Sequence, residues 1–514
     1  MSPARADFAT RGREAGERER AFRKVLVANR GEIAVRVCRT LKEMGIPSAT
    51  VYSDADRGAP HARSGDESVA IGPAPPAQSY LNAQAILEAA RRAGADAIHP
   101  GYGFLSESAT FAGQCRDAGL VFIGPSPESM ARLGDKAAAR RTAAECGVPC
   151  VPGAEGIDSV ERALAAAERV GYPVLLKASG GGGGRGMRLV QARDEMPAAL
   201  EAARREAKSA FGDGRLLLEK YIHPARHIEI QVLADGRQVV PLGERECSLQ
   251  RRHQKLIEES PSVAVTPEIR DAMQRAAVSL ARAASYAGAM TVEFLMGADG
   301  AFYFLEVNTR LQVEHTVTEM RSGLDLVRAQ VLIAAGRPVG ESLGGPEPEL
   351  RGHAIEARLC AEDPYHGWLP QTGRILLLAW PDVEGLRVDS GIAEGQTLHP
   401  YYDSLLAKVV AHGRDREDAR AKLLLALRGT ALLGVITNQS FLIDLLEDAA
   451  FRRGETSTDT VESREWQAPK EIPDAALVAA AAFLAAPRVA RGGGEEETDR
   501  YSPWRRLGAW GRTP

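Results

Sequence analysis

The sequence predicts a multidomain protein that combines an α/β domain with α+β domains, and three observations lead to this fold class. The chain has 514 residues, which is longer than a single domain usually is. Short apolar strands alternate with helical patterns as far as about residue 130, and paired strands predominate after that point. A stretch rich in Gly, Pro and Glu at 341–350 then reads as a linker to a third segment.

The first region, 23–134, is predicted to be a parallel, doubly wound sheet. Strands are expected at 24–29, 48–53, 95–99 and 120–123, and helices at 31–45, 83–93 and 109–118. In the first helix Ile33, Val37 and Leu41 recur at helical spacing, and Gly45 is a stop signal. Strand–helix alternation of this kind is typical of a parallel sheet.

The second region, 135–340, is predicted to be mixed α+β, with a smaller part at about 150–223. Helices are expected at 136–146 and 160–170, and strands at 173–178, 186–190, 229–234, 238–242, 290–296 and 301–308. The third region, 351–465, is predicted to be strand-rich and then helical from Glu417. We expect a disordered tail at 1–22 and a partly mobile extension at 466–514.

Composition excludes several classes of protein. The net charge is −4 and the pI is about 6.3, whereas nucleic-acid-binding domains are usually strongly basic. The longest apolar run, 475–486, is too short to cross a membrane, and the N-terminus lacks the apolar stretch of a secretory signal. The six cysteines show no zinc-ligand spacing, so we expect reduced thiols and a cytoplasmic location.

Five consecutive glycines, 180–184, lie between two predicted strands. Glycine has no Cβ, so successive N–H groups can surround a phosphate. A flexible linker is one alternative, although linkers are not expected between apolar strands. A dinucleotide loop is another, but that loop needs a helix behind it, and 187–190 reads as a strand. We therefore expect a lid over a triphosphate, with Lys177 on the entering strand.

Two carboxylates are predicted to face one another on a hairpin. The strands 290–296 and 301–308 are joined by a turn at 297–300. Either of two registers places Glu293 and Glu306 on one face, directly opposite or diagonal, roughly 5–8 Å apart. Because two such carboxylates repel, a cation is expected between them, and oxygen ligands suit Mg²⁺.

The same strand continues with polar residues at every second position: Glu306, Asn308, Arg310, Gln312 and Glu314. If the chain stays extended, these five side chains share one face. An exposed face of an antiparallel sheet is the alternative. The apolar residues of the hairpin favour the wall of a cleft instead.

A basic segment at 250–255 supplies cations for a small anion or a phosphate near such a site. His227 and His253 are ambiguous, because a lone histidine is more often structural. Cys247 is expected in a core or a wall, and 99–107 follows a parallel strand, where ligand crevices form.

These motifs together resemble biotin carboxylase. The matching segments are ANRGEIAVRV, HPGYGFLSE, GDK, KASGGGGGRGM, ERECSLQRRHQK, EFLMGADGAFYFLEVNTRLQVEHTVTEM and EARLCAEDP, in the same order from about Arg23 to Glu465. The resemblance implies a Rossmann-like pre-ATP-grasp domain, a central ATP-grasp domain with a mobile lid and a C-terminal α+β domain. It also implies ATP and Mg²⁺ (or Mn²⁺), with biotin as a substrate.

The resemblance assigns roles to individual residues. It places Lys136, Lys177, Gly182, Gly183, Glu219, Lys220, Ile222, His227, Gln250 and His253 at ATP. It assigns the metal to Glu293, Glu306 and Asn308, bicarbonate to Lys255, Arg310, Gln312 and Val313, and biotin to Tyr102 and Arg358. The implied catalytic residues are Arg310, Glu314, Lys255 and Arg358, with Glu314 as the general base that deprotonates bicarbonate.

The chain departs from the family pattern in places. Thr316 stands where many members have proline, and 365–368 differs from a shorter loop. The segment 502–510 resembles a stretch found in acyl-CoA carboxylase α chains, yet no Ala/Val-Met-Lys-Met biotinyl motif occurs. We therefore expect biotin on a separate carrier protein, a carboxyltransferase partner, and a homodimer or a larger complex.

Two rival functions are considered. Another ATP-grasp carboxylate–amine ligase should lack Lys255 and the spacing of Arg310, Gln312 and Glu314. A non-catalytic nucleotide-binding subunit should lack Glu293, Glu306 or Arg310, and all three are present. The final acceptor, an acyl-CoA, pyruvate or urea, is left open, with the C-terminal stretch favouring an acyl-CoA.

Overall fold

Residues 21–178, 187–211, 214–252, 254–345 and 348–468 are described in the computed structural model, together with residues 477, 478, 481, 482 and 485. The chain divides into two compact units, 1–464 and 465–514. The described residues between 477 and 485 in the second unit are helical. The predicted glycine loop, His253, the tail before residue 21 and most of the extension after 468 lie outside the described residues.

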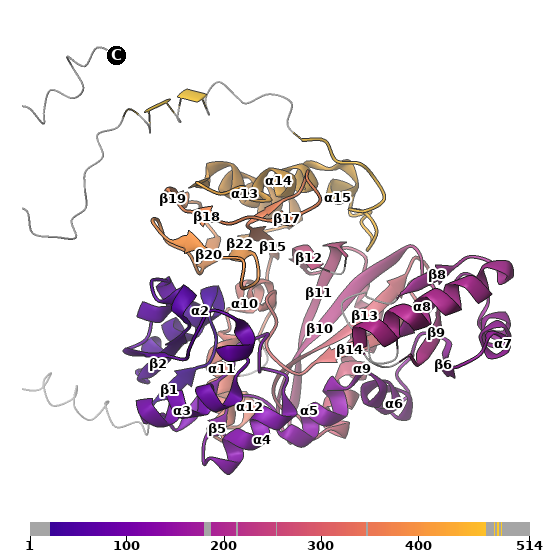
Figure 1. The fold of residues 1–514 in the computed structure, drawn as a ribbon, viewed down its shortest axis with the longest axis horizontal. Helices are drawn as coiled ribbons and strands as arrows, with labels where there is room; N and C mark the ends of the chain where they lie inside the picture. The colour runs from indigo at the N-terminus through magenta and orange to yellow at the C-terminus, as the bar shows by residue number, and fades with distance from the viewer. Residues whose placement is uncertain are drawn as a thin grey trace, which may run out of the picture. The chain divides into compact units, whose positions relative to one another are not determined.

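The N-terminal region forms a five-stranded parallel sheet in the order β3-β2-β1-β4-β5 (Figure 1). Its strands are β1 (Val25–Val27), β2 (Ser48–Tyr52), β3 (Glu67–Ala70), β4 (Ala97–His99) and β5 (Val121–Phe122). Its helices are α2 (Gly31–Glu43), α3 (Ala83–Ala93) and α4 (Ala109–Asp117), with short 3₁₀ turns η1 (Asp54–Asp56), η2 (Pro60–Arg63) and η3 (Pro76–Gln78). The predicted parallel arrangement is confirmed. Strand β3 is absent from the sequence prediction because its four residues are half polar.

Helix α3 shows how local sequence sets these boundaries. The side chain of Asn82 accepts a hydrogen bond from the backbone N of Ala85 at 3.1 Å, which satisfies an N–H group of the first turn. At the other end Gly94 adopts φ +63°, a left-handed conformation that favours glycine. The helix therefore begins and ends where its sequence predicts.

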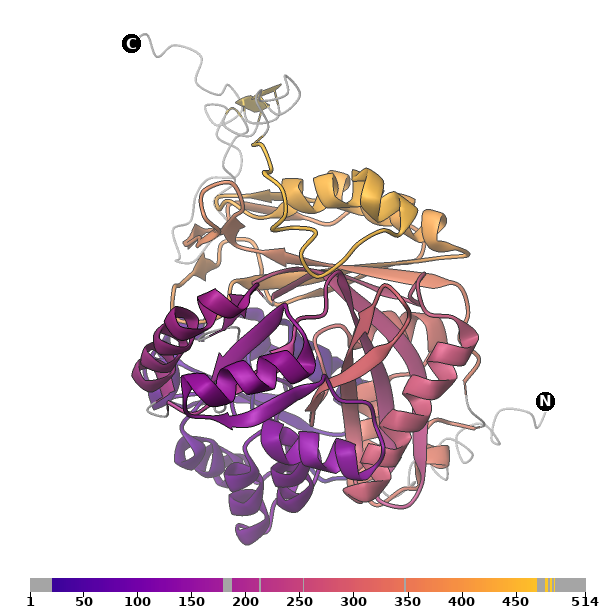
Figure 2. The ribbon, with the colours of Figure 1, turned by 90° about the vertical axis from the view of Figure 1, so that its right-hand side faces the viewer.

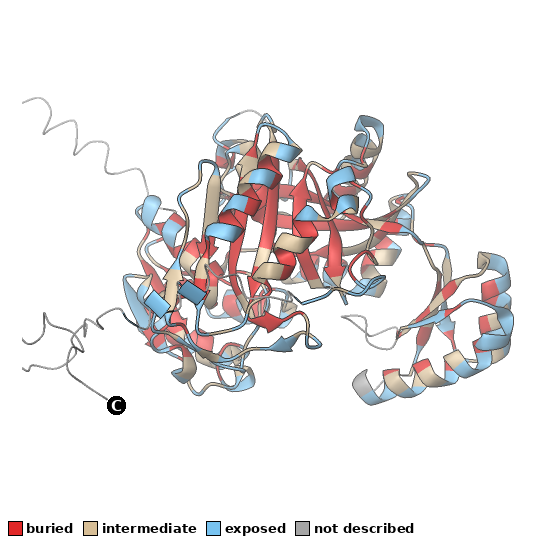
Figure 3. Cartoon of the chain, turned by 90° about the horizontal axis from the view of Figure 1, so that it is seen from above, coloured by how far each residue is buried: buried red, intermediate tan, exposed pale blue. Residues whose placement is uncertain are grey.

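The centre of the molecule is an eight-stranded sheet in the order β14-β13-β10-β11-β12-β15-β22-β20, and its strands pair antiparallel. The strands from the second region are β10 (Ala225–Asp235), β11 (Val239–Arg251), β12 (Gln254–Ser260), β13 (Ala287–Gly297) and β14 (Phe302–Asn308). The helices of this region are α5 (Pro127–Gly134), α6 (Lys136–Glu145), α9 (Pro267–Ala283), α10 (His315–Ser322), α11 (Leu326–Ala334) and α12 (Val339–Ser342). Figure 3 shows that most of the strands are buried, whereas the helices keep an exposed side.

A smaller four-stranded sheet with the order β6-β9-β7-β8 is seen with its helices in Figure 2. This part of the chain has its own apolar core. It contains β6 (Gly153–Ile157), β7 (Val174–Ala178), β8 (Arg188–Val190), β9 (Leu216–Lys220), the helices α7 (Val160–Val170) and α8 (Met196–Phe211), and the turn η4 (Arg193–Glu195). These elements fall within the part that the sequence analysis treats as a lid, about 150–223.

The third region contributes three strands to the central sheet and also forms small two-stranded sheets. Strands β15 (His353–Cys360), β20 (Leu386–Ser390) and β22 (Leu405–Gly413) extend the central sheet, and α13 (Arg416–Gly429) packs on β22 and β15. The remaining elements are β16 (Glu362–Asp363), β17 (Leu369–Pro370), β18 (Gly373–Arg374), β19 (Leu377–Ala379), β21 (Thr397–Leu398), β23 (Ala431–Leu433), α14 (Gln439–Glu447) and α15 (Ala449–Arg453). None of the described helices combines the length and apolar character needed to span a membrane.

Candidate active site

A cleft of about 1860 Å³ lies where the three regions meet. Every predicted site residue that the structure describes lines this cleft: Tyr102, Lys136, Lys177, Glu219, Lys220, Ile222, His227, Gln250, Lys255, Glu293, Glu306, Asn308, Arg310, Gln312, Val313, Glu314 and Arg358. Gly182, Gly183 and His253 fall outside the described residues. Residues far apart in the sequence therefore converge on one space.

The two carboxylates of the hairpin are direct cross-strand partners. Glu293 on β13 pairs with Glu306 on β14, so the prediction that they share a face is confirmed. The Nζ atom of Lys136 lies 2.8 Å from a carboxylate oxygen of Glu306. Glu293 accepts hydrogen bonds from Asn308 at 2.9 Å and from Gln312 at 2.7 Å. Each acid thus has partners of its own.

The chain does not remain a strand beyond Asn308, which corrects the prediction of an extended face as far as Glu314. Strand β14 ends at Asn308, and Glu314 is the N-cap residue of α10. Irregular backbone and a turn nevertheless bring Gln312 and Glu314 into the cleft. Arg310 donates from Nε to Glu107 at 2.8 Å and from Nη2 to Asn308 at 3.0 Å. The alternating pattern therefore predicted the correct side chains, but they reach the cleft from an irregular segment and a turn instead of from a strand.

Lys255 links three acids at the floor of the cleft. Its Nζ atom donates to Glu229 at 2.6 Å, to Glu293 at 3.1 Å and to Glu314 at 2.5 Å. Arg358 donates to the other oxygen of Glu314 at 2.9 Å. Glu314 is therefore held between two cations, each of which lines the cleft.

These contacts set the protonation of the acids. Burial would raise the pKa of Glu314, but Lys255 and Arg358 outweigh it and hold that pKa well below its usual range. Burial would likewise raise the pKa of Glu293, yet Lys255 and His227 keep it well below the ordinary value. Burial would lower the pKa of Lys255, but Cys247 and the surrounding carboxylates raise it well above normal. Charged groups of both signs thus face the cleft at neutral pH.

The end of the cleft nearest the small sheet carries a second set of ionic contacts. Lys177 donates to Glu219 at 2.6 Å, and Arg140 contacts the other oxygen of the same carboxylate. Lys220, which also lines the cleft, donates to the backbone oxygens of Gly171 and Tyr172 at 2.9 and 2.8 Å, so its ammonium group already has two partners. Lys177 lies on β7, the strand that leads into the glycine segment of the sequence, as predicted.

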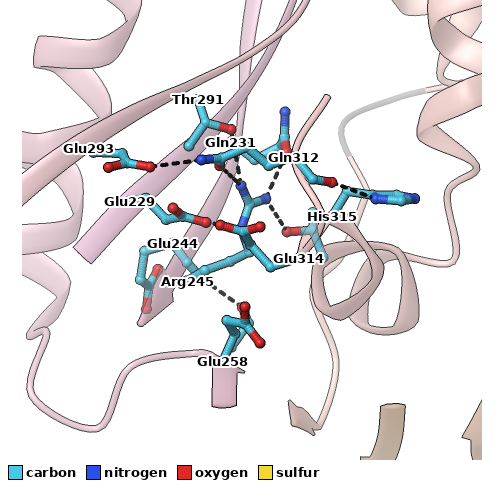
Figure 4. A network of polar contacts seen from close by, with 12 residues as sticks. Glu229, Gln231, Glu244, Arg245, Glu258, Thr291, Glu293, Gln312, Glu314 and His315 are labelled. Atoms are coloured by element: carbon cyan, nitrogen blue, oxygen red, sulfur yellow. Dashed lines mark hydrogen bonds and ion pairs between the residues drawn. The ribbon is translucent and has the colours of Figure 1, made fainter. Parts of the chain in front are cut away.

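Arg245 is an important residue that the sequence analysis does not single out. It is fully buried and donates hydrogen bonds to five side chains, as Figure 4 shows in part: Glu229, Gln231, Thr291, Gln312 and Thr318. It therefore orients both Gln312 and Glu229 beneath the cleft. The signal available in sequence is weak, because a single arginine within the segment ERECSLQRRHQK resembles any exposed cation.

The donor atoms fit a divalent cation with oxygen ligands. Two cross-strand carboxylates and the amide oxygen of Asn308 are hard ligands of the kind that Mg²⁺ and Mn²⁺ prefer. A second group, His227, Glu229 and Glu293, places possible ligand atoms within 4.8 Å of one another. In that group both oxygens of Glu229 already accept hydrogen bonds from cationic side chains, Lys255 and Arg245.

Comparison with known proteins agrees with this arrangement. Residues 21–130 match the family profile described as the biotin carboxylase N-terminal domain, and 356–463 match the biotin carboxylase C-terminal domain. Residues 135–342 match the carbamoyl-phosphate synthase L chain ATP-binding domain. The fold and the site thus define an ATP-dependent ligase of the ATP-grasp class.

Individual relatives narrow this class. A biotin carboxylase from Nostoc is 47% identical over 86% of this chain and 99% of its own length. The methylcrotonoyl-CoA carboxylase subunit alpha of Oryza sativa is 49% identical over 86% of this chain, which spans 60% of that relative. One solved structure is the biotin carboxylase domain dimer of a Hydrogenobacter thermophilus 2-oxoglutarate carboxylase, crystallised with MgADP, ADP and bicarbonate. It is 43% identical to this chain with a TM-score of 0.81, and the match covers 87% of this chain and 99% of that one. The chain belongs to the biotin carboxylase family.

Proposed function

We propose that this chain carboxylates biotin with bicarbonate at the expense of ATP, as the first half-reaction of an acyl-CoA carboxylase. The observation that carries the proposal is the position of Glu314 between Lys255 and Arg358, in the same cleft as the Glu293–Glu306 pair. The two cations suit binding of a small anion, and the ionised carboxylate between them is a group that can accept a proton.

The residues around the hairpin support binding of MgATP. We assign Glu293, Glu306 and Asn308 to the metal ion, which would neutralise the phosphates when bound. The nucleotide itself is assigned to Lys136, Lys177, Glu219, Lys220, Ile222, His227 and Gln250, with Gly182, Gly183 and His253 added from the family resemblance. The small sheet that carries Lys177 is proposed to act as the lid.

The chemistry then follows from the charges. Glu314 accepts the proton of bicarbonate, which is held by Arg310, Lys255, Gln312 and the backbone at Val313. The resulting dianion attacks the γ-phosphate of ATP and displaces ADP, and the carboxyphosphate formed breaks down to CO₂ and phosphate. That phosphate removes the N1 proton of biotin, and N1 then attacks CO₂ to give carboxybiotin.

At the biotin end, Arg358 is proposed to stabilise the ureido oxygen as negative charge develops on it, while Tyr102 forms a wall beside the ring system. Closure of the lid keeps water from the reactive carbonate species.

The partner proteins are proposed from the family to which the chain belongs and from its sequence. We propose a separate biotin carboxyl carrier protein, a carboxyltransferase subunit, and a homodimer or a larger assembly. Pyruvate or urea carboxylation is the alternative second half-reaction, because the transferase selects the acceptor. A cytoplasmic location is proposed because all six cysteines are free thiols.

Free biotin provides the test. Purified protein supplied with MgATP, bicarbonate and biotin should form carboxybiotin and release phosphate in a biotin-dependent manner. Glu314→Ala and Arg358→Ala should each lose most of this activity, and wild-type rates in both variants would refute the assignments. A carboxylate–amine ligase would release no phosphate under these conditions, so that outcome would favour the rival function.

A further inference from the structure

Two buried glutamates lie directly behind Arg358 and take no part in the chemistry described above. Glu258 on β12 and Glu356 on β15 are cross-strand partners, and neither side chain has exposed surface. Directly opposed residues on antiparallel strands have Cβ atoms about 5 Å apart. When both carboxylates are ionised, Glu356 repels the charge on Glu258, and neither side chain is in contact with water that could screen it.

Each carboxylate has one partnered oxygen and one without a partner. Glu258 Oε1 accepts a hydrogen bond from Arg358 Nε at 2.5 Å, and Glu356 Oε2 accepts one from the hydroxyl group of Thr316. Glu258 Oε2 and Glu356 Oε1 are buried and have no donor among the described residues. A proton on one of these two oxygens would supply the missing donor and remove the repulsion.

The surrounding charges do not neutralise both acids. The charged groups that face the pair are Arg358, Lys255, Lys408 and Glu314. Lys255 is bonded to three other carboxylates, and Lys408 lies 3.4 Å from Glu32 and 3.8 Å from Asp389. Arg358 is shared between Glu258 and Glu314.

The two acids have donors of different charge. A charged guanidinium group bonds to Glu258, which favours the ionised form there, whereas a neutral hydroxyl group bonds to Glu356. We propose that Glu258 and Glu356 share one proton, and that with Thr316 they are positioning residues that set the negative charge acting on Arg358. This inference rests on the proposed role of Arg358 at biotin.

The expected titration agrees with the geometry. Burial, opposed by Arg358 and reinforced by Glu356, raises the pKa of Glu258 to about 8. Burial likewise raises the pKa of Glu356 to about 7, and Lys408 and the Thr316 hydroxyl group act in the opposite direction. When the pair loses its proton, its second negative charge holds Arg358 more strongly and weakens stabilisation of the ureido oxygen. The biotin-dependent rate should therefore fall as the pH rises through this titration.

Infrared difference spectroscopy of the full chain tests the proton directly. The measurements are made in a Glu32→Gln parent protein, because burial also raises the pKa of Glu32 to about 7. The parent protein should show the C=O stretch of a protonated carboxyl group at neutral pH, and the band should disappear as the pH rises. Glu356→Gln should remove the band. The exposed acid Glu349 gives the matched control, because Glu349→Gln should leave it unchanged. A parent protein without any such band, or a band that survives when Glu356→Gln and Glu258→Gln are each added to the parent, overturns the proposal.

The pH profile of biotin carboxylation tests the function of the pair. Thr316→Val removes a hydrogen-bond donor to the ionised carboxylate of Glu356, which raises the pKa of that acid. The alkaline limb of the pH–rate profile should therefore move to higher pH by roughly one unit. Thr316→Ser should restore the wild-type profile. Thr430→Val is the control, because its buried hydroxyl group bonds to a helix carbonyl away from the cleft. Equal profiles for Thr316→Val and wild type overturn the positioning role.

The two proposals fail separately. If wild-type protein does not carboxylate biotin, the proposed function fails, while the infrared band still decides whether the pair holds a proton. If carboxylation occurs and the band is absent, the proposed function stands, and the proposal that Glu258 and Glu356 share a proton fails. A carboxyl band lost in Glu356→Gln together with the shifted limb in Thr316→Val supports the whole inference.

Discussion

Substitution of Arg245 tests whether the buried polar network supports the active site. The guanidinium group donates five hydrogen bonds, and its Nε atom is bonded to Glu229 at 2.5 Å. In Arg245→Met all five acceptors lose their donor, and Glu229 retains Lys255 as its cation. Breaking a buried ion pair by removing one partner costs roughly 3–5 kcal/mol. We expect Arg245→Met to lower the free energy of unfolding by about that amount.

The assay is a double-mutant cycle with Glu229→Gln, in which unfolding is followed by circular dichroism in increasing denaturant. A favourable coupling of at least about 1 kcal/mol between the two residues is expected. Arg91→Met is the control, because its side chain is 67% exposed and pairs with an exposed acid. Arg245→Met should also lower the turnover number, since Gln312 loses the donor that orients it. A loss below about 1 kcal/mol with unchanged turnover would refute the reasoning.

Three further predictions follow from single contacts. Glu306→Gln should raise the Mg²⁺ concentration needed for half-maximal activity by at least about tenfold, measured by Mg²⁺ titration, and an unchanged value would remove Glu306 from the metal site. Burial, opposed by Lys408, raises the pKa of Glu32 to about 7. The unfolded chain therefore releases this proton at a lower pH than the folded protein does. As a result, the free energy of unfolding should fall by up to roughly 3 kcal/mol between pH 5 and 8. Glu32→Gln should flatten that dependence in denaturant titrations, and an equally steep curve would contradict it. Trp368→Ala should raise KM for ATP roughly two- to fivefold. The reason is that the guanidinium group of Arg251 lies 4.8 Å from the Trp368 ring, and Arg251 belongs to the hairpin that carries the nucleotide residues. Trp368→Phe should largely preserve the wild-type value.

Much of the local structure could be predicted from sequence because short-range rules control it. Helix α3 begins after Asn82 and ends before Gly94, as its capping residues require. The pairing of Glu293 with Glu306 follows from a short turn between two apolar strands, since a short turn restricts the register.

Other features depend on contacts between distant segments. Strand β14 ends at Asn308, and the following turn directs Gln312 and Glu314 into the cleft, which alternation along the sequence does not reveal. The continuation of the central sheet into β15 likewise depends on pairing between β12 and β15, about a hundred residues apart.

The sequence by itself determined the family, the order of the three regions and the side chains that line the cleft, because these are carried by residue types at fixed spacings. The tertiary structure alone decided which charges are buried together. Arg245, Glu258, Glu356 and Thr316 come from different elements, and the protonation of the two glutamates depends on distance and burial. Electrostatic interaction between such groups is strong only after folding removes them from water.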